Sequence, residues 1–191
     1  MMRFRARPQR APFINALSHE ADSVTEPLTA RLPSPEDTDR MGGALARALA
    51  DAKPEIDGAG LALRLEGDLG AGKTSLMRAA LRALGWSGPV KSPTFTLLET
   101  YALSGFVFNH FDFYRFETPE EFDDAGFAEE FGPGRVCATE WSVRAEPFLP
   151  PADLFIALAP EGLGRVIEVR AATPAGIAVL EGMRKAWNGA V

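Results

Sequence analysis

The chain has 191 residues, of which 46% are hydrophobic and 24% charged, and its formal net charge at pH 7 is −6. This length is sufficient for one domain with a well-formed core, and the composition is that of a globular protein. No apolar run approaches the ~18 residues of a membrane span, so we expect no membrane association. The single cysteine, Cys137, excludes an intrachain disulfide and favours a reduced, cytoplasmic setting.

Positive charge is concentrated at the start of the chain. The first 19 residues contain four arginines and no acid, so the remainder is strongly acidic. An acidic body argues against unaided nucleic-acid binding, and any RNA should therefore be held by another protein. Residues 1–27 contain three prolines and no sustained periodicity, which predicts a disordered N-terminal extension. A transit peptide is the alternative for this Arg-rich segment.

A strand and a helix are predicted next. Leu28 to Leu32 is expected to form a short strand. Ser34 and Pro35 are typical of an N-cap and a first helical position, and acids follow at the positive end of the helix dipole. The helix has one apolar face, which consists of Met41, Leu45, Ala48 and Leu49. Asp51 to Gly60 is predicted to be a loop.

The stretch G-D-L-G-A-G-K-T at Gly67 to Thr74 fits the phosphate-binding P-loop pattern. It follows a strand-like alternation at Leu61 to Glu66 and precedes a predicted helix from Ser75 to Leu84, which is the context that the motif requires. Backbone N–H groups of the loop would surround phosphate oxygens, Lys73 would reach the β- and γ-phosphates, and Thr74 would offer its hydroxyl to Mg²⁺. An ordinary glycine-rich turn is the alternative.

The second half of the chain alternates strands with polar segments. The polar head of residues 91–101 leads into a strand, and a second strand starts at Phe106 and runs towards Arg115. Residues 117–130 hold seven acids and are expected to form one or two short helices. A short buried strand, residues 136–139, ends at Glu140. Residues 154–158 and 166–170 predict a hairpin around the turn at 160–164, and 175–187 predict a closing helix.

Two predicted strands end in acids, Asp112 and Glu140. A P-loop enzyme requires a carboxylate near Mg²⁺ and a group that orients the attacking nucleophile. Spacing alone does not decide which acid has which role, and a surface acid at a strand end is the alternative for each. Thr94 and Thr96 are candidates for a switch segment that senses the γ-phosphate, although ordinary strand threonines are the simpler interpretation.

Three further features are assigned structural interpretations. His110 beside Asp112 would suit a proton shuttle, but a structural histidine is preferred. Cys137 is predicted to be a small buried hydrophobe. The acidic run at 117–130 is expected to be a solvated face, with a docking surface as the alternative.

Four blocks occur in a fixed order: G-D-L-G-A-G-K-T at 67–74, K-S-P-T-F-T-L at 91–97, H-F-D-F-Y-R at 110–115 and E-W at 140–141. In this order they resemble the TsaE family, also called YjeE, the small bacterial ATPases of tRNA threonylcarbamoyladenosine synthesis. The resemblance covers roughly Leu32 to Ala159 well and the C-terminal hairpin and helix loosely.

The resemblance implies an α/β fold, a P-loop NTPase-like three-layer sandwich with a mostly parallel central sheet and a C-terminal antiparallel hairpin. Residues 28–191 would form a single ATPase domain. ATP and Mg²⁺ would be the cofactors, and the TsaB–TsaD transferase, which modifies adenosine 37 of ANN-decoding tRNAs, would be the partner. The tRNA would be contacted only indirectly.

The resemblance also implies roles for individual residues. Thr74 and Glu140 would be the Mg²⁺ ligands, Asp112 would orient or activate water, and Lys73 would act on the phosphates. The family motifs do not indicate which residues contact adenine. The candidates are the start of the first helix and Arg165. The residues expected to contact the nucleotide are Gly67, Asp68, Leu69, Gly70, Ala71, Gly72, Lys73, Thr74, Ser75, Thr96 and Trp141.

This chain departs from the family pattern at three places. Residues 1–27 extend beyond the usual start, Ser75 stands where a second threonine is common, and Thr139 stands where an apolar residue often precedes the acid. A small-molecule P-loop kinase is the main alternative function. A GTPase is disfavoured because the guanine-recognition motif N/T-K-x-D does not occur. A module that senses nucleotide without hydrolysing it is the remaining alternative function.

Overall fold

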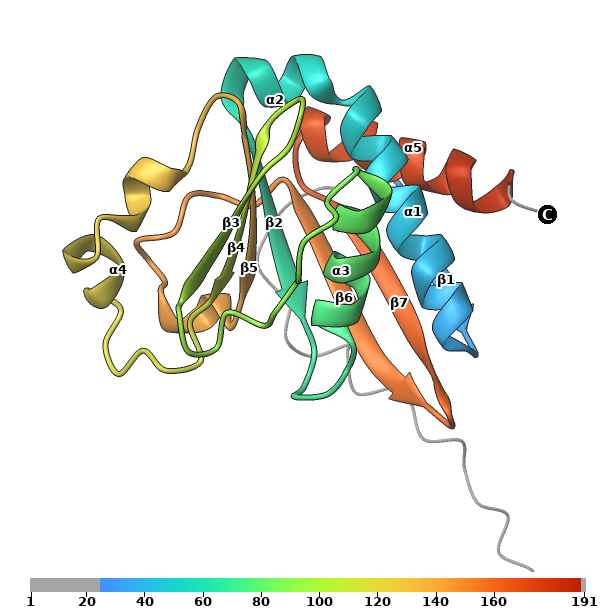
Figure 1. Ribbon diagram of the computed structural model, residues 1–191, viewed down its shortest axis with the longest axis horizontal. Coiled ribbons are helices and arrows are strands. Elements are labelled where there is room, and N and C mark those ends of the chain that lie inside the picture. Colours follow the sequence, from blue (N-terminus) through green and yellow to red (C-terminus); the bar gives the residue numbers. More distant parts are fainter. Residues whose placement is uncertain (1–24, 190–191) are drawn as a thin grey trace, which may run out of the picture.

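A computed structural model describes residues 25–189 (Figure 1). Seven strands form one sheet in the order β1-β7-β6-β2-β5-β4-β3. The strands are β1 (Leu28–Leu32), β2 (Leu61–Glu66), β3 (Leu98–Ala102), β4 (Val107–Asp112), β5 (Arg135–Glu140), β6 (Leu154–Glu161) and β7 (Gly164–Ala171). The helices are α1 (Pro35–Asp51), α2 (Lys53–Ala59), α3 (Lys73–Ala83), α4 (Glu121–Asp124) and α5 (Pro174–Asn188), with 3-10 turns η2 (Phe127–Glu130) and η3 (Ser142–Arg144).

The centre of the sheet is parallel and its two sides are antiparallel. Strands β6, β2, β5 and β4 pair in parallel, while β3 pairs antiparallel with β4, and β7 pairs antiparallel with both β6 and β1. The carboxyl ends of the four parallel strands therefore meet at one edge, which points downwards in Figure 1. In an open α/β sheet this edge is where ligands bind.

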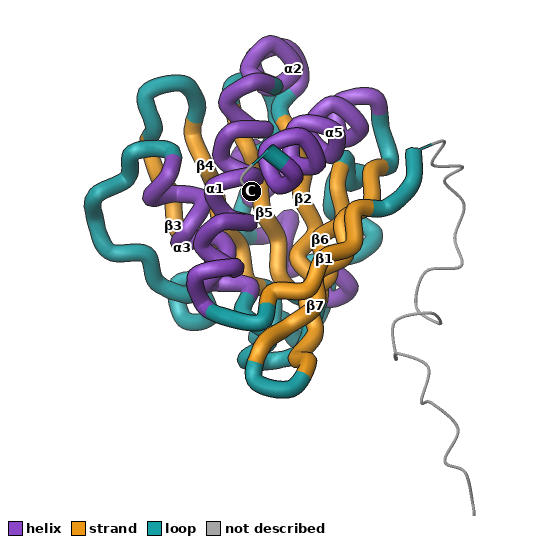
Figure 2. The backbone as a smooth tube through the Cα atoms, turned by 90° about the vertical axis from the view of Figure 1, so that its right-hand side faces the viewer, coloured by secondary structure: helices purple, strands orange, loops and turns teal. Residues whose placement is uncertain are grey.

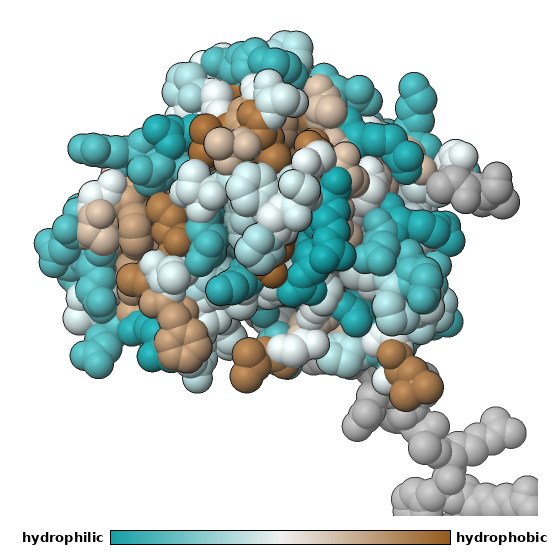
Figure 3. All heavy atoms as spheres, in the orientation of Figure 1, coloured by the Kyte–Doolittle hydropathy of each residue, from teal (hydrophilic) through white to brown (hydrophobic). Residues whose placement is uncertain are grey.

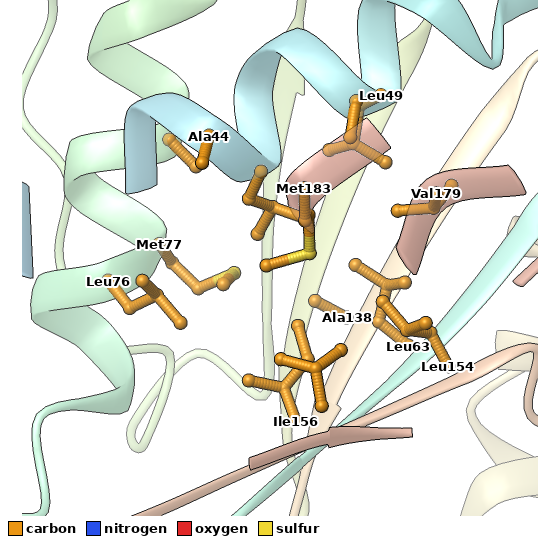
Figure 4. Close-up of a cluster of buried hydrophobic side chains, with 14 of the residues drawn as sticks. Ala44, Leu49, Leu63, Leu76, Met77, Ala138, Leu154, Ile156, Val179 and Met183 are labelled. Atoms are coloured by element: carbon orange, nitrogen blue, oxygen red, sulfur yellow. The ribbon is translucent and has the colours of Figure 1, made fainter. Parts of the chain in front are cut away.

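The three long helices cover one face of the sheet. Helix α1 lies between α3 and α5 and contacts both (Figures 1 and 2). Their apolar faces pack on the strands in one core that includes Ala44, Leu49, Leu63, Leu76, Met77, Ala138, Leu154, Ile156, Val179 and Met183 (Figure 4). Continuous burial along β2 agrees with a parallel strand covered on both faces.

The other face is covered by the short elements α4, η2 and η3 and their connections. Its core is built largely from aromatic rings, among them Phe111 and Phe113 of the β4 region and Phe122 of α4. Ring centroids of Phe111 and Phe113 lie 5.6 Å apart, and those of Phe113 and Phe122 5.9 Å apart. The molecule therefore has the three layers that the family resemblance implied, with one thick and one thin helical layer.

The start of α1 confirms the predicted cap. Ser34 Oγ accepts a hydrogen bond from the Asp37 N–H, at 3.2 Å, and the Asp37 carboxylate accepts one from the Ser34 N–H, at 3.1 Å. This reciprocal capping box satisfies two helix-end donors. Met41, Leu45, Ala48 and Leu49 are all buried, as their spacing indicated.

The predicted loop from Asp51 to Gly60 is wrong, because residues 53–59 form helix α2. Pro54 lies in the first turn, where a missing N–H costs nothing, and Ile56 is the one buried side chain that anchors the helix. The chain leaves the helix at Gly60 with φ 82°, where a Cβ atom would lie 2.2 Å from the Gly132 carbonyl oxygen. This tertiary contact is not visible in the local pattern.

Other elements match with shifted ends. Helix α3 begins at Lys73 rather than Ser75 and ends at Ala83. The predicted hairpin is longer than expected, since its strands continue to Glu161 and Gly164 and leave a two-residue turn. Residues 1–24 of the predicted extension lie outside the described residues. At residue 26, the backbone carbonyl accepts a hydrogen bond from Arg184 at 2.6 Å.

Candidate functional site

The P-loop connects the carboxyl end of β2 to the first residue of α3. Gly67, Gly70 and Gly72 have φ values of 130°, 82° and 105°, which side-chain-bearing residues rarely adopt. A Cβ atom at Gly67 would lie 2.2 Å from the Leu158 carbonyl oxygen, so this glycine is also required by the neighbouring strand β6. The first N–H groups of α3 lack intrahelical partners and open onto the loop. The loop thus has the backbone that an anion cradle needs.

Lys73 is held inside this loop. Its ammonium donates to the carbonyl oxygens of Gly67, at 2.7 Å, and Asp68, at 3.1 Å, and lies 3.4 Å from a carboxylate oxygen of Glu140. The side chain is only 5% exposed. A buried positive charge is thereby fixed between the loop and the end of β5.

Glu140 and Asp112 lie side by side at the edge of the sheet, because β4 and β5 pair them in register. Glu140 faces Lys73 on one side and His110 on the other, with its second carboxylate oxygen 3.0 Å from His110 Nε2. His110 is fully buried, which agrees with a structural histidine, but its contact with Glu140 was not expected from the sequence. Asp112 is 2% exposed.

The loop 91–97 is tied to Asp112. The Thr94 hydroxyl donates to one oxygen of Asp112 at 2.6 Å, and the Tyr114 N–H donates to the other at 2.9 Å. Arg115 Nε donates to the Thr94 carbonyl at 2.7 Å, and its guanidinium lies 4.3 Å from the centre of the Phe95 ring. Of the two threonines considered for a switch, the structure therefore brings Thr94 to the acid.

Thr96 lies outside this constellation. It is exposed, and its hydroxyl donates to Glu99 at 3.0 Å rather than to Asp112. Thr74 and Ser75 lie in the first turn of α3 and are half-buried. Asp68, Leu69 and Gly70 form the exposed crest of the P-loop.

Trp141 follows Glu140 in a left-handed backbone conformation, φ 57° and ψ 37°. Its ring centre lies 5.6 Å from the Lys73 ammonium and 5.1 Å from the ring of Tyr114. The indole therefore lies beside Lys73 at the P-loop. Among the described residues, no group of three or more His, Cys, Asp or Glu could hold a metal ion. A P-loop Mg²⁺ is compatible with this, since Mg²⁺ takes few protein ligands and keeps waters and phosphate oxygens.

Arg165, at the start of β7, covers the other side of the P-loop. A Cβ atom built on Gly72 would lie 1.8 Å from Arg165 Nη1, so the guanidinium rests on the backbone of this glycine. Nη1 is buried and has no hydrogen-bond partner within residues 25–189. The only sequence signal for this residue was the family resemblance, because the contact joins positions 93 residues apart.

A family model described as threonylcarbamoyl adenosine biosynthesis protein TsaE matches residues 32–167, which include every residue of the site described above. A curated protein named tRNA threonylcarbamoyladenosine biosynthesis protein TsaE, from Haemophilus influenzae, is 38% identical over 151 residues, which are 79% of this chain and 94% of that protein. A protein of the same name from Bacillus subtilis is 38% identical over 128 residues, 67% of this chain and 75% of that one.

The fold is similar to a solved structure, that of YdiB from Bacillus subtilis. The TM-score is 0.63 at 27% identity, and the match covers 84% of this chain and 95% of that one. No helix within residues 25–189 has the length and apolar character needed to cross a membrane.

Proposed function

The chain belongs to the TsaE family of threonylcarbamoyl adenosine biosynthesis proteins, and within that biosynthesis we propose that it binds and hydrolyses ATP. The observation that carries this proposal is the contact between the Lys73 ammonium and the Glu140 carboxylate at the head of a P-loop. It joins a phosphate-binding cation to an acid in the position of a metal ligand, with Asp112 on the adjacent strand.

Each side chain has a proposed role. The loop N–H groups and Lys73 bind the phosphates, and Thr74 and Glu140 hold Mg²⁺, which when bound neutralises charge on the phosphate oxygens. Asp112 orients the attacking water, and Thr94 and the Tyr114 N–H fix the position of its carboxylate. Trp141 shields the Lys73 side of the site from solvent.

We further propose that the active form is a complex. Large apolar side chains are exposed at Leu69 of the P-loop, Phe95 of the 91–97 loop, Val143 after β5 and Leu163 at the hairpin tip. All four belong to segments at the carboxyl edge of the parallel strands, where Figure 3 shows brown patches along the lower edge. Exposed apolar groups around a site mark an interaction surface. The proposed partner is the TsaB–TsaD transferase, which would bring the tRNA.

Lys73→Ala tests the phosphate cradle. It removes a charge-assisted contact worth roughly 1.5–3 kcal/mol, so Mg²⁺·ATP affinity should fall about tenfold to over a hundredfold in calorimetry. Lys185→Ala is the matched control, since that lysine is exposed on α5, and it should bind like the wild type. Unchanged affinity in a folded Lys73→Ala protein would refute the P-loop assignment.

Glu140→Gln tests the metal position in the same titration. The affinity for ATP should fall about tenfold or more when Mg²⁺ is present and change little with EDTA. An equal loss under both conditions would contradict a metal-ligand role.

Transfer of phosphate to a small acceptor, rather than to water, would instead support the kinase alternative.

A further inference from the structure

Trp141 occupies a backbone conformation that a bulky residue adopts only at a cost. Left-handed geometry is unfavourable for side chains with a Cβ, and such residues persist only where the surroundings determine them. The φ of 57° turns the chain directly after Glu140 and directs the indole towards Lys73. Some part of the structure must therefore hold this turn.

The residues flanking the turn are bonded to each other. Thr139 Oγ1, one residue before Glu140, lies 2.8 Å from Ser142 Oγ, one residue after Trp141. The Thr139 hydroxyl also donates to the Leu63 carbonyl of β2 at 3.1 Å. Since its single proton is used there, Ser142 is the donor between the two hydroxyls. The two hydroxyls close the turn across Glu140 and Trp141.

A buried guanidinium completes the network. Arg64 of β2 is 4% exposed, and its Nη1 donates to Thr139 Oγ1 at 3.2 Å. Its Nη2 donates to the Pro150 carbonyl and lies 3.9 Å from the half-exposed Glu146 carboxylate. Burial lowers the pKa of Arg64, so the interior tolerates this charge only because these contacts satisfy it. Arg64 thus contacts the chain at Thr139 and at Pro150, on either side of the segment that contains Trp141.

We propose that Arg64 is a positioning residue of the nucleotide site, which acts through Thr139 and Ser142 to hold Trp141 against Lys73. The role presupposes the nucleotide site proposed above. Arg64 donates hydrogen bonds to Thr139 and Pro150 rather than to Asp112 or Glu140, and its strand leads straight into Gly67. The hydroxyl of Thr139, unexpected before a metal-binding acid, is explained as the acceptor that Arg64 needs.

The test compares Arg64→Met, Arg64→Lys and Thr139→Val in a background with Trp86→Phe and Trp187→Phe, so that Trp141 is the only tryptophan and its emission can be followed selectively. Met removes both donor nitrogens, Lys keeps the charge but places its N–H groups on one nitrogen without the planar fork of the guanidinium, and Val removes the acceptor hydroxyl. Leu63→Val is the matched control, because this fully buried residue lies on the same strand but in the opposite core.

We expect Arg64→Met and Thr139→Val to change the emission of Trp141 without nucleotide and to weaken ATP affinity about tenfold, within the range of couplings inside one hydrogen-bond network. The double variant should lose little more than either single one, and Arg64→Lys should be intermediate. Leu63→Val should lower the melting temperature and leave emission and affinity unchanged.

Variants that lose thermal stability while keeping wild-type emission and affinity, as the control does, would overturn the proposal. If Arg64→Met does not fold, Thr139→Val and Arg64→Lys decide the question. Failure of the wild type to bind nucleotide would refute the proposed function instead, and the emission of Trp141 would still test the turn.

Discussion

Arg165 is a charged side chain at the P-loop whose Nη1 is buried and has no hydrogen-bond partner in the described part of the chain. The sheet order β7-β6-β2-β5 places it on the opposite side of the P-loop from Glu140. If Glu140 marks the metal and γ-phosphate end, Arg165 faces the nucleoside end. A buried donor of this kind is costly unless a ligand group satisfies it.

Arg165→Met should therefore weaken ADP and ATP binding alike, by about tenfold, the value of a lost hydrogen bond to a charged group. Arg31→Ala is the control, because that arginine lies on the neighbouring strand β1 with a side chain that is 79% exposed. Calorimetry with both nucleotides makes the comparison. A loss confined to ATP would place Arg165 at the γ-phosphate and contradict this assignment.

Cys137 gives a pH dependence with a definite sign. The thiol is 1% exposed, and burial raises its pKa from 9.0 to about 12. The unfolded chain loses this proton first as the pH rises, so the contribution to stability is complete below pH ~9 and is lost progressively towards the folded-state pKa.

Between pH 8 and 10.5, the wild type should therefore lose about 2 kcal/mol more unfolding free energy than Cys137→Ala, an upper value for complete burial. Urea titrations of both proteins at the two pH values measure the difference, and other titrating groups cancel. A difference that does not change with pH would show that the thiolate forms in the folded protein.

At the scale of elements, the contact between α1 and α3 depends on one glycine. A Cβ atom on Gly42 would lie 2.4 Å from the Ala79 Cβ and 2.9 Å from the Ala80 backbone nitrogen, whereas one on Gly43 would meet nothing within 4 Å. The adjacent glycines of one helix thus have opposite requirements.

Gly42→Ala should lower the free energy of unfolding by about 1–3 kcal/mol through overpacking. Gly43→Ala should raise it by roughly 0.8–1 kcal/mol, because alanine favours the helix. Chemical denaturation of the two variants checks both signs. If Gly42→Ala also stabilises the protein, α1 and α3 do not pack as closely as described.

Elements with a long regular pattern could be predicted from the sequence, and those that depend on distant contacts could not. The cap and apolar face of α1 are local, so Ser34, Met41 and Leu45 were identified correctly. Helix α2 has one buried anchor, Ile56, and ends where Gly60 meets Gly132, a contact that no local pattern reveals.

The same division applies to the site. The P-loop is contiguous, so its pattern could be read directly from the sequence, and Asp112 and Glu140 were expected at strand ends, where the structure has them. Their neighbours were not predictable, because the contacts of Glu140 with His110 and of Thr139 with Arg64 depend on the register between strands far apart in sequence. Thr94 and Thr96 have the same sequence signal, and only the fold separates them.

At the scale of the whole molecule, the proposed nucleotide site and the exposed apolar residues lie at the same edge of the sheet. Leu69 and Phe95, exposed by 88% and 84%, belong to the two loops that surround Lys73 and Asp112. A partner that covers them would also exclude water from the phosphates and could supply a missing catalytic group, as partners of other P-loop enzymes do. The acidic body favours tRNA delivery through that partner.

We propose above all that this chain hydrolyses ATP at Asp112 when a partner completes the site. The most direct measurement is phosphate release from Mg²⁺·ATP by the full-length protein alone, with the TsaB–TsaD pair of the same organism, and with the pair and Asp112→Asn. The pair without this protein is the blank. We expect slow release alone, at least about a tenfold increase with the pair, and a loss of about a hundredfold or more in the Asp112→Asn mixture. Rapid release by the isolated protein that the pair leaves unchanged, or full activity of Asp112→Asn, would contradict the account.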